Sequence, residues 1–182
     1  MYTSVPHVVN VPYTPYTETY KKEEVRVPED CKTLEEAVKK VHRDDSLTTI
    51  LVGAGEHLIN GNNLVIRSDM RIVGRPSVSR DKIVILGGIL FKKEIGMCHL
   101  QHLTLQAKGS GVRGYSSYTM EDVLVKQCGH NGVYAHGNGI ACRCTNVEVH
   151  QSARSGVLAT NGASITLIGA KTTVRHNCTK GN

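Results

Sequence analysis

Aromatic residues are scarce in this chain of 182 residues. Tryptophan is absent, and Phe91 is the only phenylalanine. Beyond residue 95 the tyrosines are limited to Tyr115, Tyr118 and Tyr134. Surfaces that bind nucleic acid interleave aromatic rings with cations, so this shortage argues against nucleic acid as the ligand. It also argues against a groove in which a long series of sugar rings would stack.

Long apolar runs, a regular cysteine framework and an apolar leader after Met1 are missing as well. The longest apolar runs are far too short to cross a bilayer. Six cysteines without regular spacing do not indicate a secreted disulfide scaffold. We therefore expect a soluble, cytoplasmic protein that makes no membrane contact.

Acidic residues are few in the second half of the chain. Residues 1–95 hold 14 Lys and Arg against 13 Asp and Glu, whereas residues 96–182 hold 8 against 3 and six of the nine histidines. A basic half can attract an acidic polymer such as nucleic acid or an anionic glycan, or it can be a solvated face without a polymer ligand. Three acidic residues among surplus cations form a poor calcium site, and we expect neither a metal nor a cofactor.

One helix is well marked near the N-terminus. Thr33 can cap it, and Glu36 follows three positions later, as in a capping box. The apolar residues after the cap have helical spacing, namely Leu34, Ala37, Val38 and Val41. We predict a capping helix over residues 33–45, preceded by an extended arm rich in proline and tyrosine over residues 1–28. The sequence shows no second helix strong enough to connect parallel strands, so a doubly wound fold is not expected.

Short strand-like runs follow, and a pattern repeats every 20 to 25 residues. The runs aligned by the repeat are 103–105, 123–125, 147–149 and 172–174, with Gly-Val pairs behind them at 111, 132 and 156. Before these runs stand Cys98, Tyr118, Cys142 and Leu167, in positions that the repeat makes equivalent. Three short strands per repeat predict an all-β fold, a single parallel β-helix over residues 29–182.

The repeat also predicts which side chains meet. Leu103, Val123 and Val147 should stack inside the coil, one winding above the other, and the valines of the Gly-Val pairs should form a second inner stack. The last coil is incomplete, because Gly181 stands where the next Gly-Val pair would begin. An uncapped final coil exposes strand edges, so we expect homo-oligomer formation through that end as one alternative.

The chain resembles a known superfamily in its helix and first strands. The segment "CKTLEEAVKKV" followed by "TTILVGAGEHLI" looks like the entry to right-handed parallel β-helix domains of the pectin lyase-like superfamily. The later coils resemble carbohydrate-binding and sugar-hydrolase repeats, as also found in certain F-box proteins and in uncharacterised algal β-helix proteins. The resemblance covers about residues 26–182. It implies the fold, whereas the activity stays open, because this fold hosts lyases, hydrolases, epimerases, adhesins and binding modules.

Polar residues alternate with the inner ones and should form an outer face. Its three stacks are His102, Asp122, Asn146 and Lys171; Thr104, Leu124, Glu148 and Thr173; and Gln106, Lys126, His150 and Arg175. The backbones of Asp122 and Glu148 should lie roughly 8 Å apart, which permits the acid and base of an inverting glycosidase. The alternative is simple charge pairing, of Asp122 with Lys126 or Lys171 and of Glu148 with Arg175.

No catalytic set of the superfamily carries over to this sequence. Polygalacturonase-like members use a cluster of aspartates that includes an adjacent pair, and the only such pair here, Asp44-Asp45, lies off the coils. Pectate lyase-like members bind calcium through several acidic residues, which the later coils lack. Cys142 and Cys144 have a spacing that zinc can use, yet the repeat turns both inward, and we expect them to be core residues.

The expected function is therefore a non-catalytic binding or scaffolding module whose ligand is a carbohydrate or a partner protein. The candidate ligand-binding residues are His102, Lys126, His150 and Arg175 on the polar face, with Tyr115, Tyr134 and His136 as a possible platform for a sugar. The alternatives are a polysaccharide hydrolase, lyase or epimerase that uses Asp122 and Glu148, and a structural protein that associates with itself.

Overall fold

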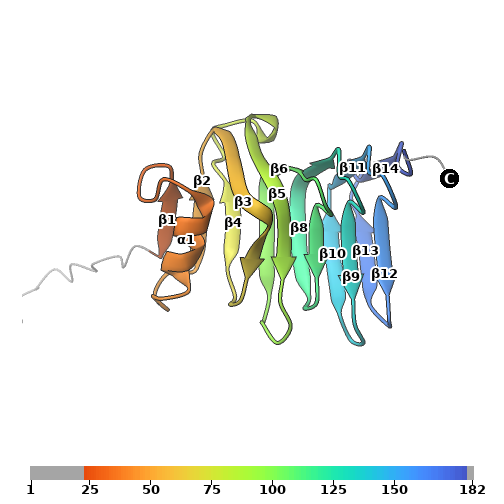
Figure 1. Cartoon of the computed structure of the whole chain (residues 1–182), viewed down its shortest axis with the longest axis horizontal. Coiled ribbons are helices and arrows are strands. Elements are labelled where there is room, and N and C mark those ends of the chain that lie inside the picture. Colours follow the sequence, from red (N-terminus) through yellow and green to blue (C-terminus); the bar gives the residue numbers. More distant parts are fainter. Residues whose placement is uncertain (1–22, 180–182) are drawn as a thin grey trace, which may run out of the picture.

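Residues 23–179, which the computed structural model describes, form a parallel β-solenoid of about six turns (Figure 1). Its elements in chain order are β1 (Glu24–Val27), α1 (Leu34–Val41), β2 (Thr49–Val52), β3 (Gly55–Ile66), β4 (Arg71–Gly74), the 3-10 helix η1 (Arg80–Lys82), β5 (Ile83–Phe91), β6 (Cys98–Gln106), β7 (Val112–Gly114), β8 (Tyr118–Lys126), β9 (Val133–His136), β10 (Ala141–Thr145), β11 (Glu148–His150), β12 (Val157–Thr160), β13 (Ser164–Ile168) and β14 (Thr173–Arg175). All the strand pairs are parallel, as the repeat predicts.

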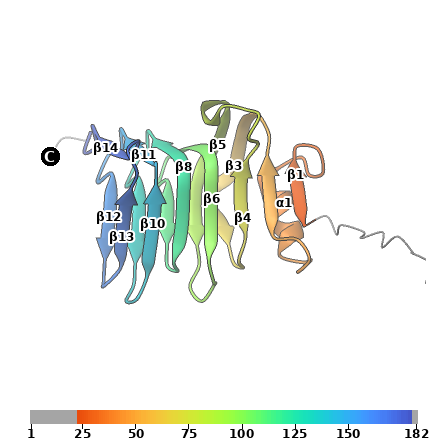
Figure 2. The same cartoon turned by 180° about the vertical axis from the view of Figure 1, so that it is seen from behind.

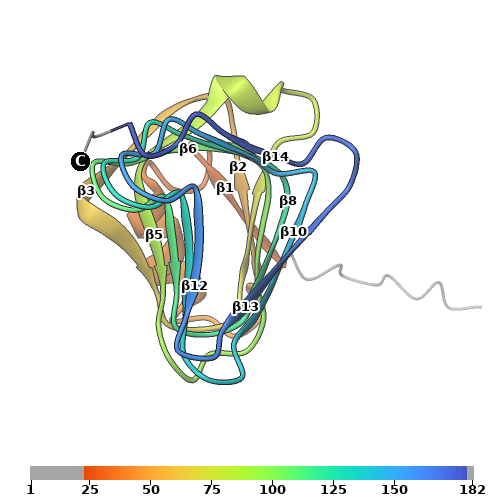
Figure 3. The same cartoon turned by 90° about the vertical axis from the view of Figure 1, so that its right-hand side faces the viewer.

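The cross-section has three sides (Figure 3). The first side, which Figure 2 shows, contains β1, β2, β4, β10, β13 and the first halves of β6 and β8. The second side contains β11, β14, the second halves of β6 and β8, and the first halves of β3 and β5. The third side contains β7, β9, β12 and the second halves of β3 and β5.

The winding is right-handed. Figure 3 views the solenoid from its C-terminal end, where β12, β13 and β14 follow one another counter-clockwise as the chain approaches the viewer. The fold class predicted from the repeat, and the right-handed winding that the resemblance implies, are therefore confirmed.

The inner stacks lie where the repeat places them. Leu103 pairs with Val123, and Val147 is buried in the next winding. Val112 pairs with Val133, which pairs with Val157. Each fully buried aliphatic side chain of this kind contributes about 1.5–3 kcal/mol relative to an exposed one. Stacks of buried aliphatic side chains, paired from one coil to the next, are thus the main source of stability in the solenoid.

Gly111 shows why the Gly-Val pairs need glycine. A Cβ atom at Gly111 would lie 2.6 Å from Cγ1 of Val125 and 2.8 Å from the carbonyl oxygen of Gly132 in the next coil. The backbone of the neighbouring winding passes too close for any side chain. Crowding at this corner, rather than a left-handed backbone, accounts for the repeated glycine.

One predicted equivalence is wrong. Cys98 pairs with Tyr118, but Cys142 pairs with Ile165, while Leu167 lies beside Cys144. Paired residues are therefore fewer positions apart in the sequence between β10 and β13, on the first side, than between β11 and β14, on the second side. The difference arises because the corner after β13 contains Gly169, with a φ of +95°, and extra residues where the preceding coil turns at Asn146.

The N-terminal elements differ from the prediction at their ends. Helix α1 begins after Thr33, whose hydroxyl accepts a hydrogen bond from the backbone N–H of Glu36, and it ends at Val41 rather than at residue 45. Carboxylates are unfavourable at a helix C-terminus, and Asp44 instead accepts hydrogen bonds from the backbone and hydroxyl of Ser46. Strand β1 belongs to the solenoid although it lies within the segment assigned to the arm; residues 1–22 lie outside the described residues.

The corner between the first and second sides takes two forms. In three coils it is made by one residue with a left-handed backbone, and these residues are His102, Asp122 and Asn146. Aspartate, asparagine and histidine tolerate this conformation better than other side chains. In the coil of β4 and β5 the corner is a longer segment, residues 75–82, which includes η1 and which we call the strap.

The two ends of the described solenoid are unlike each other. Helix α1 packs against β1, β2 and β3 and covers the N-terminal end. In the last described coil the side chains of Leu167 and Val174 are each 42% exposed. The Gly-Val position expected at Gly181 lies beyond the described residues.

Candidate functional site

The strap lies over the polar face predicted on the second side. Its 3-10 turn places the backbone carbonyl of Arg80 above β6, where the hydroxyl of Thr104 donates a hydrogen bond to it at 2.9 Å. Thr104 is consequently buried, although alternation along the strand predicts an exposed side chain. The strap thus converts part of an open sheet face into covered surface.

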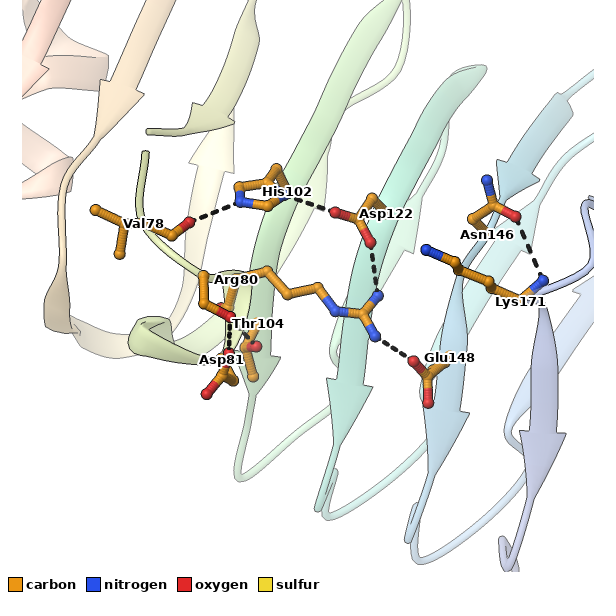
Figure 4. A network of polar contacts seen from close by, with 10 residues as sticks. Val78, Arg80, Asp81, His102, Thr104, Asp122, Asn146, Glu148 and Lys171 are labelled. Carbon is orange, nitrogen blue, oxygen red and sulfur yellow. Dashed lines mark hydrogen bonds and ion pairs between the residues drawn. The ribbon is translucent and has the colours of Figure 1, made fainter. Parts of the chain in front are cut away.

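Arg80 joins the two predicted catalytic carboxylates (Figure 4). Its Nη1 donates to Oδ1 of Asp122 at 3.0 Å, and its Nη2 donates to Oε1 of Glu148. The Arg80 side chain is 19% exposed, so the strap shields this contact from water on one side. Asp122 and Glu148 are brought together as predicted, but through a cation supplied from 42 and 68 residues away in the sequence.

His102 extends the same network. Its Nδ1 lies 2.6 Å from Oδ2 of Asp122, and its Nε2 lies 2.7 Å from the backbone carbonyl oxygen of Val78 in the strap. A carbonyl oxygen only accepts, so Nε2 donates, and a ring protonated on both nitrogens donates to both partners. His102 therefore fastens the strap to the corner at Asp122 rather than projecting toward a ligand.

This geometry supports charge pairing at the polar face, with a different partner from the predicted ones. The sequence suggested Lys126, Lys171 or Arg175, whereas within residues 23–179 both carboxylates form their ion pairs with Arg80. Both carboxylates are thus held by a guanidinium of the protein itself. Arg80 was missed because the strap is an insertion that the repeat does not describe.

The remaining candidates on the second side form a basic row. Lys126 pairs with His150, which pairs with Arg175, so their side chains follow one another at about 4.8 Å per coil. Figure 4 shows Lys171 at the neighbouring corner, where its backbone N–H donates to Oδ1 of Asn146. The predicted stacking is correct, and the row is polar and open to solvent.

The aromatic candidates gather on another side of the molecule. Tyr134 and His136 point outward from β9, and the hydroxyl of Tyr134 lies 2.9 Å from Nδ1 of His136. Tyr115, just after β7, meets His136 edge to face with ring centroids 5.5 Å apart. Thr160 of β12 completes the cluster, with its hydroxyl 3.0 Å from Nδ1 of His136. The three residues predicted as a platform do lie together, on the third side.

Cations surround this aromatic cluster. Arg113 lies over the ring of Tyr134, 5.9 Å from its centroid, and its buried Nε has no hydrogen-bond partner within the described chain. A cavity of about 610 Å³ next to the cluster is lined by Arg67, Lys92, Lys93 and Tyr115. Within residues 23–179, none of the four cations, Arg67, Lys92, Lys93 and Arg113, forms an ion pair. The sequence could not show this cavity, because its residues come from three successive corners.

Cys98, Cys142 and Cys144 are core residues, as predicted, and Cys128 is buried as well. Burial raises the pKa of Cys98 and Cys128 to about 11 and that of Cys144 to about 12. Burial likewise raises the pKa of Cys142. These thiols stay protonated at neutral pH and do not act as thiolate ligands or nucleophiles. Over the part of the chain that is described, no group of three or more His, Cys, Asp or Glu side chains is arranged to hold a metal ion.

No helix in the described range has the length and apolar character needed to cross a membrane. No protein-family model, curated protein or solved structure matches the chain. The geometry of its own residues is therefore what bears on function.

Proposed function

We propose that the protein is a non-catalytic binding module that holds an anionic carbohydrate on its third side. The observation that carries this proposal is that the rings of Tyr115, Tyr134 and His136 lie together beside a cavity whose cations form no ion pair within residues 23–179. Aromatic rings pack against the C–H faces of sugar rings, while guanidinium and ammonium groups bind carboxylate or sulfate substituents.

Charge on the third side supports an anionic ligand over a neutral one. Its strands contain no aspartate or glutamate, and Arg113 together with Arg67, Lys92 and Lys93 gives four positive charges near the rings. The second side supports catalysis less well, because Arg80 holds Asp122 and Glu148. A polysaccharide-modifying enzyme, of the pectin lyase-like kind that the sequence resembles, is accordingly the weaker alternative.

A glycan array that includes uronate-containing, sulfated and neutral chains tests the proposal. We expect the protein to retain anionic glycans and to lose them as the salt concentration rises, because exposed charges are screened. Replacing Tyr134 with alanine should reduce the affinity about tenfold, since one ring loses its contact with the sugar. Silence across all anionic glycans would contradict the proposal.

A matched pair of variants separates the cavity from net charge. Lys92→Gln with Lys93→Gln removes two charges at the cavity, whereas Lys39→Gln with Lys40→Gln removes two exposed charges on α1. The first pair should weaken binding several-fold more than the second. Equal losses would mean that only the overall charge attracts the glycan.

We infer a second role, self-association, from the exposed inner residues of the last described coil. Leu167 and Val174 have the alternation of core residues yet remain 42% exposed. Helix α1 covers the opposite end, so a second copy would meet the same coil face rather than the helix. That arrangement closes as a dimer and does not grow into a filament.

A further inference from the structure

A cavity of about 670 Å³ lies beside the polar face of the second side, with which it shares Gln106. It opens at the corner between the second and third sides. Its lining is Leu58, Ile59, Asn60, Gly61, Asn62, Leu86, Gly87, Gln106, Ala107, Lys108, Gln127 and Gly129. A volume of this size lies in the range of ligand pockets in proteins.

A bulge in β3 builds one wall of the cavity. Leu58 pairs with Leu86 and Asn63 pairs with Gly88, so residues 59–62 stand opposite the single residue Gly87 and overhang the next coil. Ile59 packs directly on Gly87, because a Cβ atom added at Gly87 would lie only 2.5 Å from Cβ of Ile59. The backbone N–H of Asn60 donates to Glu35 of α1 at 2.6 Å. The overhang is thus held from both sides and is preformed.

Four residues with primary amide side chains line this cavity, namely Asn60, Asn62, Gln106 and Gln127. Within residues 23–179 none of these side chains makes a hydrogen bond to the protein. Each primary amide carries a donor and an acceptor side by side, which is the complement of a peptide group. Extended peptides are often bound through hydrogen bonds of this kind to their main chain.

The other residues that line the cavity indicate which apolar and charged groups a ligand would carry besides peptide groups. Leu58 is 65% exposed and pairs with Leu86, so two aliphatic side chains face the opening. Lys108 is the only charged side chain in the lining, which has no carboxylate. Aromatic rings, on which a sugar would stack, are also missing from it. A ligand with an aliphatic side chain next to a carboxylate would contact both leucines and pair with Lys108.

We propose that this cavity binds an extended peptide segment of a partner protein in which an aliphatic side chain neighbours a carboxylate. The peptide groups bond to the four amides, the aliphatic side chain covers Leu58 and Leu86, and the carboxylate pairs with Lys108. This site is independent of the glycan proposed for the third side, because the two cavities share no residue.

Titration of the full chain with N-acetylleucine, followed by NMR, tests the site. This probe combines one peptide group, one isobutyl group and one carboxylate. We expect shifts in the methyl signals of Leu58 and Leu86 and in the four side-chain amides. N-acetylleucinamide, which lacks the charge, and N-acetylglycine, which lacks the side chain, should both bind more weakly. A methyl glucoside should leave these signals unmoved.

Two variants with matched controls assign the contacts. Lys108→Gln should weaken N-acetylleucine about two- to fivefold and leave N-acetylleucinamide unchanged, whereas Lys171→Gln, also exposed, should alter neither. Leu58→Ser should weaken both probes about tenfold, and Met97→Ser, which changes another exposed apolar residue, should not.

Two results would overturn the proposal. One is an absence of shifts at Leu58 and Leu86 at the solubility limit of N-acetylleucine. The other is an equal response of the four amides to the glucoside, which would make the cavity a sugar site. A negative glycan array leaves this outcome unaffected, so the two proposals fail separately.

Discussion

At the scale of single residues, His42 shows how one side chain connects the cap to the coils. It ends α1, and its Nε2 accepts a hydrogen bond from the backbone N–H of Arg67, 25 residues later, at 3.2 Å. Burial lowers the pKa of His42, and the neighbouring Arg67 guanidinium lowers it further. Only the neutral ring can accept this bond, so the folded state binds the proton less readily than the unfolded chain does.

Stability should therefore fall on acidification through the titration of His42. The stabilisation is fully present above the ordinary histidine pKa of about 6.5, and it is lost as the pH falls below that value. We expect His42→Gln, which keeps an acceptor that does not titrate, to flatten the fall in free energy of unfolding between about pH 7 and pH 5. Urea denaturation at a series of pH values measures this slope.

His130→Gln provides the matched control, since His130 is exposed. Its slope should equal that of the unmodified protein. If His42→Gln and His130→Gln give the same slope, then the contact with Arg67 does not set the pH dependence.

At the scale of elements, the strap is the feature that distinguishes the second side from a plain repeat. Four polar contacts hold it. Arg80 pairs with Asp122 and with Glu148, His102 bonds to the carbonyl of Val78, and Thr104 bonds to the carbonyl of Arg80. Partly exposed ion pairs of this kind contribute little one by one. Together they fix an insertion that would otherwise be free to move.

Replacing Arg80 with methionine should lower the free energy of unfolding by about 1 kcal/mol, because Asp122 and Glu148 then lose the guanidinium that joins them. It should also speed amide exchange over residues 75–82. Urea denaturation and hydrogen exchange measure the two effects. Arg143→Met removes an exposed arginine from the first side and should change neither. Equal behaviour of the two variants would mean that the network does not hold the strap.

At the scale of the whole molecule, the solenoid is asymmetric along its axis. The N-terminal end is covered by α1, and the last described coil shows Leu167 and Val174 to solvent. Exposed strand edges with apolar residues favour pairing with another chain. Association of two copies and ligand binding on the long sides are compatible, because they use different surfaces.

Light scattering over a range of protein concentrations tests the proposed association. We expect the mass to rise toward that of a dimer, and we expect Leu167→Lys to keep the protein monomeric because the charge meets the apolar edge of the second copy. Met97→Lys adds the same charge at an exposed apolar residue elsewhere and should still dimerise. A monomeric mass for the unmodified protein at every concentration would rule out this role.

The sequence predicted the fold well because a solenoid repeats one short-range pattern. Leu103, Val123 and Val147 stack since inward and outward positions alternate along each strand, and that alternation is visible in the sequence. The prediction went wrong at Leu167, where the longer corner at Gly169 shifts the register by two residues. The end of α1 was placed too late for a similar reason, because Asp44 serves the turn and not the helix.

The candidate sites were predictable only in part. The repeat placed Lys126, His150 and Arg175 in one row, and Tyr134 and His136 on one strand face. It could not show that Arg80 would cross the second side, nor that Arg67, Lys92 and Lys93 would line one cavity. These contacts come from corners and insertions, whose direction depends on the backbone and not on the repeat.

The sequence by itself determined the parallel coil, its inner stacks and its N-terminal cap, because these follow from spacing that is local to each winding. Only the tertiary structure decided which polar groups meet, since the strap, the bulge in β3 and the corners bring together residues that are far apart in the chain. Hydrophobic periodicity specifies a core, whereas a binding surface depends on where the exceptions to that periodicity lie.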